Sequence, residues 1–400
     1  MSEQRFSGQM NPEKAETVEQ RAYRFEGFPD EEQQDLLKQF IGAARFLWNR
    51  MLGDWNASYE EKGKSDPIKT PAAYKKEPGL EWMQEIDALV FANVQRHFER
   101  AVKDFFSGKL EHPRFKKKGK CKNSYTTNKA SNSTNNLRLE GCMLKLPKIK
   151  NQVRLRLHRK IKVGGILKNC TVTHEPNGKW YFSLVFEYPK TEVLKTADAK
   201  TEAEINAIGL DMSLPELYVD SNNGVPGYPK PYRQIEARLK KEQRKLSKME
   251  YDSSNYKKQQ KRVAKLHAKA KRQRADFLHK LSYILTHKYD IICIEDLDMN
   301  AIKEALNFGK SVSDNGWGMF IRMLEYKADW YGCVIIKVDR WFPSSKQCVK
   351  CGHIHKELKL SDRTYICPEC GHVMDRDYQA AINIRNEGIR IFTGSHTQAA

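Results

Sequence analysis

Apolar residues recur at helical spacing through the first quarter of the chain. Pro29-Asp30-Glu31-Glu32 is typical of a helix start. From there to about Lys109, apolar residues recur mostly at three- and four-residue steps. The clearest stretch comprises Trp82, Ile86, Leu89, Val90, Val94, Phe98, Ala101, Val102 and Phe105. This pattern predicts a helical lobe over residues 31–122, preceded by a first strand at 21–30 and a disordered leader at 1–20.

The period then changes from that of a helix to that of a strand. Residues 153–158 alternate strictly between apolar and basic side chains, which places Arg154 and Arg156 on one face. Pro176-Asn177-Gly178 separates two strand-like runs, which is a hairpin signal. We therefore expect a small β-barrel with one basic face over residues 123–195.

The C-terminal half alternates buried strands with helices. Apolar runs predict strands at 207–212, 216–220, 291–295 and 334–338, and helical periods at 234–287, 317–331 and 378–386. This order is expected of an RNase H-like α/β domain. The predicted fold class is multidomain α+β: a helical N-terminal lobe, a small β-barrel, and an RNase H-like domain. That domain would comprise residues 196–341 and 375–390, with an insert at 342–374 and a tail at 391–400.

The net charge of the chain favours a polyanionic partner. The chain has 70 Lys and Arg against 50 Asp and Glu, a formal charge of +20. Each phosphate that such a protein neutralises releases condensed counterions, which favours binding to nucleic acid. Lysines that only solvate helix faces are the alternative, but the basic residues come in runs. The candidate nucleic-acid contacts are Arg114, Lys116, Lys117, Lys118, Lys120, Arg154 and Arg156.

Two other classes of protein are disfavoured. The first residues are polar and lack the apolar core of a signal peptide. No run approaches the roughly 20 consecutive apolar residues that cross a bilayer, so no membrane partner is expected. The nine cysteines are an odd number, and four of them form two CxxC pairs. This usage favours metal binding in a reducing compartment over a disulfide scaffold.

Three acidic residues stand at positions where a carboxylate needs a positive partner. Asp211 ends the apolar run 208–210, Glu295 ends the run 291–294, and Asp377 begins the last predicted helix. A carboxylate at the end of a buried strand is costly unless it binds a cation. Three of them on adjacent elements can hold two Mg²⁺ ions. Two such ions about 4 Å apart would activate water and stabilise the leaving oxygen in phosphodiester hydrolysis.

Each of these acids has a simpler interpretation, and Glu295 and Asp377 each have an acidic neighbour that could be the metal ligand instead. A single strand-end aspartate is more often a turn or helix cap than a metal ligand. Asp296 follows Glu295, but strand alternation turns it to the opposite face. Asp375 lies two residues before Asp377 and suits the role of a helix cap better. The set of three in this order therefore carries the catalytic prediction.

Two CxxC pairs predict a structural zinc site. Cys348 and Cys351 are separated from Cys367 and Cys370 by fifteen residues. This spacing is that of a four-thiolate zinc ribbon, in which Zn²⁺ replaces the hydrophobic core that so small a module lacks. The remaining five cysteines are scattered and need no functional interpretation.

With these motifs in place, the chain resembles the TnpB proteins of IS200/IS605-type transposons, RNA-guided nucleases related to the compact type V CRISPR effectors. The likeness is dense in the C-terminal half and sparser before it, and runs from about residue 21 to 388. It rests on the following segments: 42–52, 275–281, 294–297, 317–328, Phe342-Pro343-Ser344-Ser345-Lys346-Gln347-Cys348, the zinc ribbon, and 375–384.

The resemblance implies roles for individual residues. Asp211, Glu295 and Asp377 match the three catalytic positions of the family's RuvC nuclease domain, and the four cysteines match its zinc-binding insert. Residues 31–122 would form a recognition lobe, and residues 21–30 with 123–195 a wedge-like β-barrel that grips guide RNA. Two departures stand out: 212–216 reads Met-Ser-Leu-Pro-Glu where the family has Gly-Ile-Lys-like residues, and Gln379 stands where Asn is usual.

The sequence therefore predicts an RNA-guided DNA endonuclease of a prokaryotic cytosol or nucleoid, with Mg²⁺ and Zn²⁺ as cofactors. Its partners would be a guide RNA and a target DNA, and a monomer is favoured. Two alternatives stay open. The departures near Asp211 and at Gln379 suit a guide-dependent repressor without nuclease activity, and the same fold also suits a transposase that needs no RNA.

Overall fold

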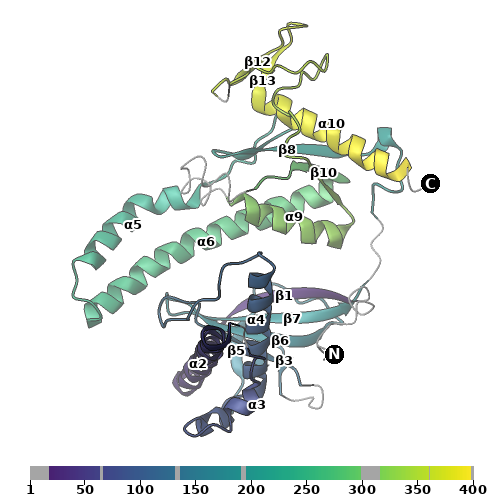
Figure 1. The fold of residues 1–400 in the computed structure, drawn as a ribbon. Coiled ribbons are helices and arrows are strands. Elements are labelled where there is room, and N and C mark those ends of the chain that lie inside the picture. Colours follow the sequence, from purple (N-terminus) through teal and green to yellow (C-terminus); the bar gives the residue numbers. More distant parts are fainter. Residues whose placement is uncertain are drawn as a thin grey trace. The chain divides into compact units, whose positions relative to one another are not determined.

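The computed structural model describes residues 18–63, 66–130, 136–190, 195–298, 316–359 and 361–397 (Figure 1). The chain divides into two compact units, Met1–Thr191 and Glu192–Ala400, and each is described by itself. The first unit holds the predicted helices and the basic strands. The second holds the three acidic residues and the four paired cysteines.

The helices of the first unit begin where the sequence predicts. Asp30 caps the first long helix: its side chain accepts a hydrogen bond from the Gln33 amide, and the Gln33 side chain accepts one from the Asp30 amide. The helix ends at Gly63, whose φ of 64° is one that glycine adopts without strain. The helical elements are α2 (Glu31–Lys62), α3 (Pro71–Tyr74), a 3₁₀ turn (Glu81–Gln84) and α4 (Ala88–Phe106).

Seven antiparallel strands form the sheet of the first unit. Their order is β2-β6-β7-β1-β5-β4-β3. Their bounds are β1 (Val18–Phe28), β2 (Ser124–Asn128), β3 (Arg138–Glu140), β4 (Met143–Lys145), β5 (Val153–Arg156), β6 (Ile166–His174) and β7 (Trp180–Pro189). The predicted hairpin is confirmed, since β6 and β7 pair across a turn in which Gly178 has φ 86°. The basic face is confirmed too, because Val153 and Leu155 are buried while Arg154 and Arg156 are exposed.

Two details of this unit differ from the expectation. Strand β1 begins at Val18, within the segment expected to be a leader, because it pairs with β7 from Val18 to Gly27. Among the described strands the sheet is also open rather than a closed barrel, with β2 and β3 at its edges. Closure is not needed to bury its apolar face, because helices pack on that face.

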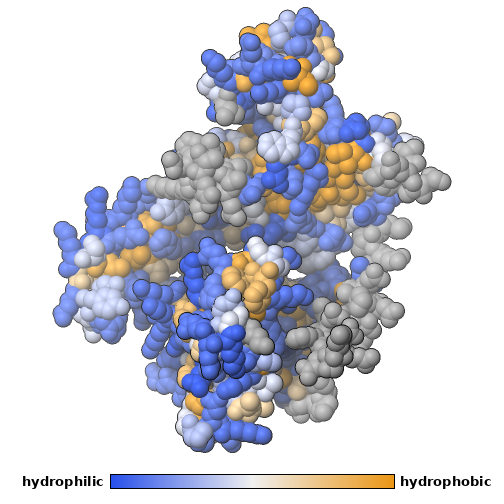
Figure 2. Space-filling model, in the orientation of Figure 1, coloured by the Kyte–Doolittle hydropathy of each residue, from blue (hydrophilic) through white to orange (hydrophobic). Residues whose placement is uncertain are grey.

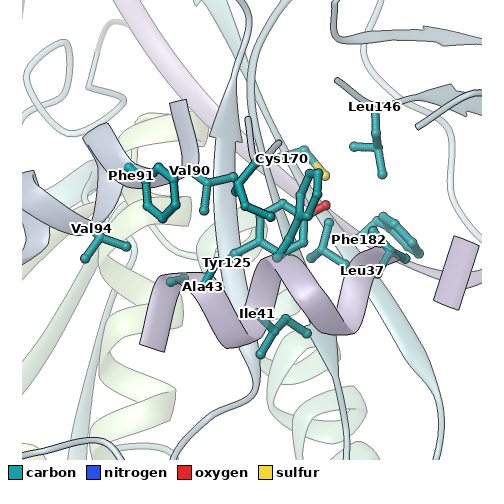
Figure 3. Close-up of a cluster of buried hydrophobic side chains, with 14 of the residues drawn as sticks. Leu37, Ile41, Ala43, Val90, Phe91, Val94, Tyr125, Leu146, Cys170 and Phe182 are labelled. Atoms are coloured by element: carbon teal, nitrogen blue, oxygen red, sulfur yellow. The ribbon is translucent and has the colours of Figure 1, made fainter. Parts of the chain in front are cut away.

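One hydrophobic core joins the helices to the sheet. Figure 3 shows Leu37 of α2 and Val90 of α4 beside Tyr125 of β2 and Phe182 of β7. Leu37, Val90 and Phe182 are fully buried. Neither the helices nor the strands could bury these side chains alone, so the predicted lobe and barrel share one core.

The second unit is built on a four-stranded sheet of order β11-β10-β8-β9. Strands β8, β10 and β11 are parallel, and β9 is antiparallel to β8. The bounds are β8 (Ala207–Ser213), β9 (Leu217–Asp220), β10 (Ile291–Glu295) and β11 (Val334–Val338), which confirms all four predicted strands to within a residue. A small hairpin, β12 (Thr364–Ile366) with β13 (Val373–Asp375), flanks the second CxxC pair and leads into α10.

Helices cover both faces of this sheet. Helix α10 (Arg376–Thr397) lies across one face, and α9 (Trp317–Tyr331) lies on the other with α6 (Ser254–Lys288) packed beside it (Figure 1). Strand alternation divides the core accordingly. Ile292 and Ile294 of β10 join the core of α6 and α9, whereas Ile291 and Cys293 join the core of α10.

Two helix boundaries differ from the prediction. The basic stretch expected to be one helical segment is two helices, α5 (Pro231–Ser247) and α6, separated by a turn in which Asp252 has φ 64° and Ser253 caps α6. Helix α10 continues to Thr397, so part of the expected tail is helical. The reason is burial: Phe392 is 6% exposed and packs into the same core as Ile384.

Glycines set how closely α10 approaches the sheet. A Cβ atom added to Gly209 of β8 would overlap the Ala381 carbonyl of α10 and lie 2.6 Å from the Arg385 amide. A Cβ added to Gly388 of α10 would overlap the Cys293 sulfur and lie 2.7 Å from the Cys293 Cβ. The helix therefore rests on β8 and β10 at positions that admit no side chain.

Gly388→Ala is expected to destabilise the protein by about 1–3 kcal/mol, because the added methyl group overpacks the contact with Cys293. Gly394→Ala on the same helix is the matched control, since nothing lies within 4 Å of its Cβ position. Its greater helix propensity should leave stability unchanged or slightly higher. Urea unfolding followed by circular dichroism compares the two, and equal stability of both variants would show that the close contact is not needed.

Candidate functional site

Two acidic side chains lie next to each other on adjacent parallel strands. Ile294 of β10 is in register with Leu210 of β8, and Glu295 and Asp211 are the next residues on each strand. Neighbouring strands lie about 4.8 Å apart. Alternation puts Asp211 on the face of Gly209, which contacts α10, and Glu295 on the face of Cys293. Both carboxylates therefore stand at one end of the sheet, on the side that α10 covers.

Helix α10 brings the third acid to the same end of the sheet. Asp377 lies in its first turn. Asp375 caps the helix, with its carboxylate accepting a hydrogen bond of 2.9 Å from the Tyr378 amide, as predicted for this neighbour. Two arginines contact Asp377: Arg376 at 3.0 Å and Arg363 at 3.3 Å. The structure thus brings together the three acids that the sequence singled out.

Asp211 and Glu295 are carboxylates whose burial is only partly offset by nearby positive charge or hydrogen bonds. Burial, followed by the nearby Glu295 and Asp377 carboxylates, raises the pKa of Asp211 well above its usual range, and Arg376 opposes this only in part. Burial also raises the pKa of Glu295, against the hydrogen bond from Ser344. Like charges held this closely favour a bound cation, because it replaces their repulsion with attraction.

The oxygen donor set fits a hard divalent ion such as Mg²⁺, which binds one or two carboxylates and keeps several waters. Within the ranges that the structure describes, only the four paired cysteines form a group of three or more potential ligands whose donor atoms all lie within 4.8 Å of one another, so the three acids are spread more widely than that. Water or substrate oxygens would have to complete the coordination of an ion bound at Asp211 and Glu295.

A polar chain that the sequence did not reveal holds Glu295 in place. The Ser344 hydroxyl donates to Glu295 Oε1 at 2.5 Å. Ser344 is itself fixed by Asn383 of α10, whose buried amide donates to the carbonyls of Ser344 and Gln347, each at 2.7 Å. The only sequence signal was that Ser344 and Asn383 lie in segments that resemble the family. Ser344 and Asn383 are 39 residues apart in the sequence, and local periodicity cannot predict a contact over that separation.

The amide of Gln379 is also buried in α10. Its Oε1 and Nε2 atoms have no hydrogen-bond partner among the described residues. A primary amide without partners is costly in a protein interior. This is the position at which the chain departs from the family's usual asparagine, two residues after Asp377.

The four paired cysteines converge as the spacing predicts. Cys348 and Cys370 sulfurs lie 3.7 Å apart, and Cys351 and Cys367 sulfurs 3.5 Å apart. A tetrahedron with Zn–S bonds of about 2.3 Å has sulfurs about 3.8 Å apart. The cluster therefore fits a zinc ion, whose role would be structural because four thiolates leave no open position. None of the nine cysteines is in a disulfide.

The two halves of this cluster are built alike. In each, the first cysteine's amide donates to the carbonyl of the histidine five residues later, Cys348 to His353 and Cys367 to His372, both at 2.8 Å. A glycine after the second cysteine makes the turn, with φ 75° at Gly352. The repeated Cys-x-x-Cys-Gly-His pattern is thus two copies of one metal-binding turn. The histidines serve through their backbone.

The predicted nucleic-acid contacts lie in two groups in the first unit. Arg114, Lys117, Lys118 and Lys120 are exposed, as are Arg154 and Arg156 of β5. Lys116 differs: its ammonium lies 3.6 Å from the centre of the Trp48 ring, and burial lowers its pKa to about 8. Asn49 fixes the backbone of Lys116 through hydrogen bonds of 2.7 and 2.9 Å.

Lys116 also lines a pocket that the sequence did not predict. The pocket has a volume of about 230 Å³ and lies between α2, α4 and β2. Arg45 and His97 contribute further nitrogen atoms to its wall. No periodicity signal could have found it, because its residues come from three elements.

None of the helices in the described ranges is both long and apolar enough to span a membrane.

We expect about one zinc ion per purified chain, measured by plasma mass spectrometry. Cys370→Ser should lower this content strongly, because it removes one of four ligands. Cys142→Ser is the control, since Cys142 is exposed and outside the cluster. A wild-type protein without zinc, or a Cys370→Ser variant that retains the full amount, would contradict the assignment.

Asn383→Ala should destabilise the protein by about 1–3 kcal/mol, because two buried carbonyls lose their donor. Asn386→Ala is the matched control on the same helix, because Asn386 is exposed. Thermal or urea unfolding would measure both. If the two variants were equally stable, the Asn383 contacts would not support the loop that carries Ser344.

Comparisons with known proteins show which family this chain is similar to. Three family profiles match in succession: a helix-turn-helix domain of IS605 OrfB proteins at residues 19–64, the IS605 OrfB family described as "Probable transposase" at 184–306, and the Cas12f1-like TNB domain at 317–384. The last match includes the paired cysteines and Asp377. The fold resembles a solved Cas12f1–sgRNA–target DNA complex, with a TM-score of 0.55 and 14% identity over 89% of this chain and 83% of that one.

Two relatives are similar over nearly the whole chain. A protein of Streptomyces pristinaespiralis is 32% identical over 92% of this chain and 89% of its own length. InsQ of Escherichia coli K12 is 28% identical over 92% of each chain. Both carry the name "Putative RNA-guided DNA endonuclease". The mixed α+β fold, the cysteine cluster and this likeness together show that the chain belongs to the TnpB family of IS200/IS605-type transposons.

Proposed function

We propose that this chain is an RNA-guided, metal-dependent DNA endonuclease with a RuvC-type active site at Asp211, Glu295 and Asp377. The observation that carries the proposal is the convergence of these three carboxylates at one end of a parallel sheet. Family membership adds support, since its relatives carry the name of that activity.

The nuclease domain is proposed to be RNase H-like. Its elements follow in the order β8, β9, the helices α5 and α6, β10, α9, β11 and α10. This alternation of strands with helices supports the proposal, and so does the likeness of the fold to the Cas12f1 structure. The fold places the ends of β8 and β10 beside the first turn of α10, which is where the acids lie.

Each acid has a distinct part in the proposed reaction. Asp211 and Glu295 would share the metal ions, and Asp377 would complete the site from α10. Two Mg²⁺ ions supply an activated water and stabilise the leaving oxygen of a phosphodiester. Ser344 keeps the Glu295 carboxylate oriented through its hydrogen bond. Arg363 and Arg376 balance the charge of Asp377 and offer cations to a phosphate.

The zinc ribbon is proposed to be a structural insert over residues 342–374. It lies between β11 and α10, begins with the loop of Ser344 and ends just before the turn of Asp377. Arg363, which contacts Asp377 at 3.3 Å, belongs to this insert. Ordering of the ribbon by Zn²⁺ would therefore fix one cation beside the acidic site.

The proposed partners are a guide RNA and the target DNA paired to it. The protein would contact the sugar-phosphate backbone of the A-form RNA–DNA duplex without recognising its base sequence. It would recognise directly only a short DNA motif that flanks the target. Residues 31–122 would be a recognition lobe, and β1 with 123–195 a wedge-like domain. The basic residues from Arg114 to Lys120, with Arg154 and Arg156, supply positive charge there. The hairpin of α5 and α6 is also strongly basic, and its visible surface is mainly hydrophilic (Figure 2).

Asp211→Asn, Glu295→Gln and Asp377→Asn should each abolish cleavage while RNA binding is retained. Asp296→Asn is the matched control, because Asp296 adjoins Glu295 yet is exposed and contacts Arg340. The assay uses the protein with its copurifying RNA, a DNA target designed from the sequence of that RNA, and Mg²⁺. The cleaved DNA products are separated and quantified on gels.

Other outcomes identify the alternatives. A wild-type complex that binds its target but leaves it intact in Mg²⁺ is a guide-dependent repressor. Strand-transfer products that form without RNA indicate a transposase. Cleavage that persists in all three variants would contradict the assignment of the acids.

A further inference from the structure

One aromatic side chain beside the acidic site is exposed to solvent. Trp341 is 84% exposed, in the loop that follows β11. Tryptophan is usually well buried because its large apolar surface is costly in water. Its neighbour Phe342 shows that the chain could bury an aromatic ring here, since Phe342 packs against the core that contains Val338 and Ile384. The loop therefore leaves Trp341 exposed, although Phe342 next to it packs against the core.

The loop that presents Trp341 is fixed on both sides. The Trp341 amide donates to the Asp339 carboxylate at 2.7 Å, and the Phe342 amide donates to the Asp339 carbonyl at 3.0 Å. On the far side, Ser344 is held by Asn383 and donates to Glu295. The indole is thus displayed by a turn whose backbone is anchored to the sheet and to α10.

This anchoring places the indole close to the carboxylates. Val338 is in register with Glu295, and Trp341 follows it by three residues. Trp341 also precedes Ser344, which contacts Glu295, by three residues. Three residues of chain reach at most about 11 Å. The Trp341 backbone is therefore within about 11 Å of both Val338 and Ser344, a span of roughly three nucleotides at about 3.4 Å each.

The surroundings of Trp341 suit a nucleobase better than a protein surface. Between residues 334 and 346 it is the single exposed large apolar side chain. A lone indole offers one flat ring, which matches the face of one base, whereas a protein interface needs a contiguous apolar patch. Arg340 precedes it and contacts Asp296 at 3.5 Å, an exposed pair that a phosphate could displace.

From these contacts we propose that Trp341 is a substrate-positioning residue that stacks on a base of single-stranded target DNA beside the scissile phosphate. This inference rests on the proposed nuclease function, because it takes the acids to mark the scissile phosphate. Stacking would hold the strand in register with Asp211 and Glu295. It is tolerant of sequence, since every base has an aromatic face.

The test compares three substitutions of Trp341 in the full complex with copurifying RNA and target DNA. Trp341→Ala removes the ring, Trp341→Phe retains an aromatic face, and Trp341→Leu retains apolar bulk without one. Single-turnover cleavage in Mg²⁺ should fall about tenfold or more in the Ala and Leu variants, the effect of losing one stacked base. The Phe variant should cleave at close to the wild-type rate, and zinc content should not change.

A second readout does not depend on cleavage. 2-Aminopurine is placed singly along both strands of the target, and its fluorescence is recorded with EDTA present. Wild type and Trp341→Phe should quench the probe at one or two positions more than Trp341→Ala and Trp341→Leu do. Those positions should lie within a few nucleotides of the cut made in Mg²⁺.

The outcomes separate this inference from the function on which it rests. Unchanged cleavage and fluorescence in all three variants would overturn the stacking role and leave the nuclease intact. Full activity of Trp341→Leu would also overturn it, because apolar packing would then suffice. If wild type cut no DNA, the nuclease proposal would fail. A missing difference in quenching between wild type and Trp341→Ala would then reject DNA stacking as well.

Discussion

The close packing of α10 on the parallel sheet is the constraint on which the rest of the second unit depends. Gly209 and Gly388 allow the helix backbone and the strands to approach to a distance that a methyl group would prevent. Gly209 lies two residues before Asp211, and Gly388 contacts Cys293, two residues before Glu295. The contacts that position the helix therefore also fix Asp211 of β8 and Glu295 of β10 relative to it.

The same helix organises the surrounding polar groups. Its first turn carries Asp377, and Asn383 one and a half turns later holds the loop of Ser344, which orients Glu295. The zinc cluster lies in the chain between that loop and the helix, so its folding fixes the start of α10 from the other direction. Packing and hydrogen bonding thus support a single arrangement of the three carboxylates, and a zinc ion at the four cysteines would add to that support.

Much of this arrangement could be predicted from the sequence. Buried parallel strands read as short apolar runs, so residues 291–295 and 334–338 were predicted with the bounds that the structure shows. Their ends pointed to Glu295, and the CxxC spacing pointed to the zinc cluster. Contacts between distant residues could not be predicted, such as Ser344 with Glu295 or the core shared by α2 and the first sheet. Local periodicity carries no information on such contacts, and for the same reason it did not show that the first sheet is open.

The proposed mechanism requires Asp211, Glu295 and Asp377 to hold divalent ions together. Anomalous diffraction from crystals of the complex soaked in Mn²⁺, a substitute for Mg²⁺, would locate such ions. We expect anomalous density bounded by all three carboxylates, distinct from the zinc signal at the four cysteines. Manganese bound elsewhere, with the three carboxylates unoccupied at saturating concentration, would contradict it.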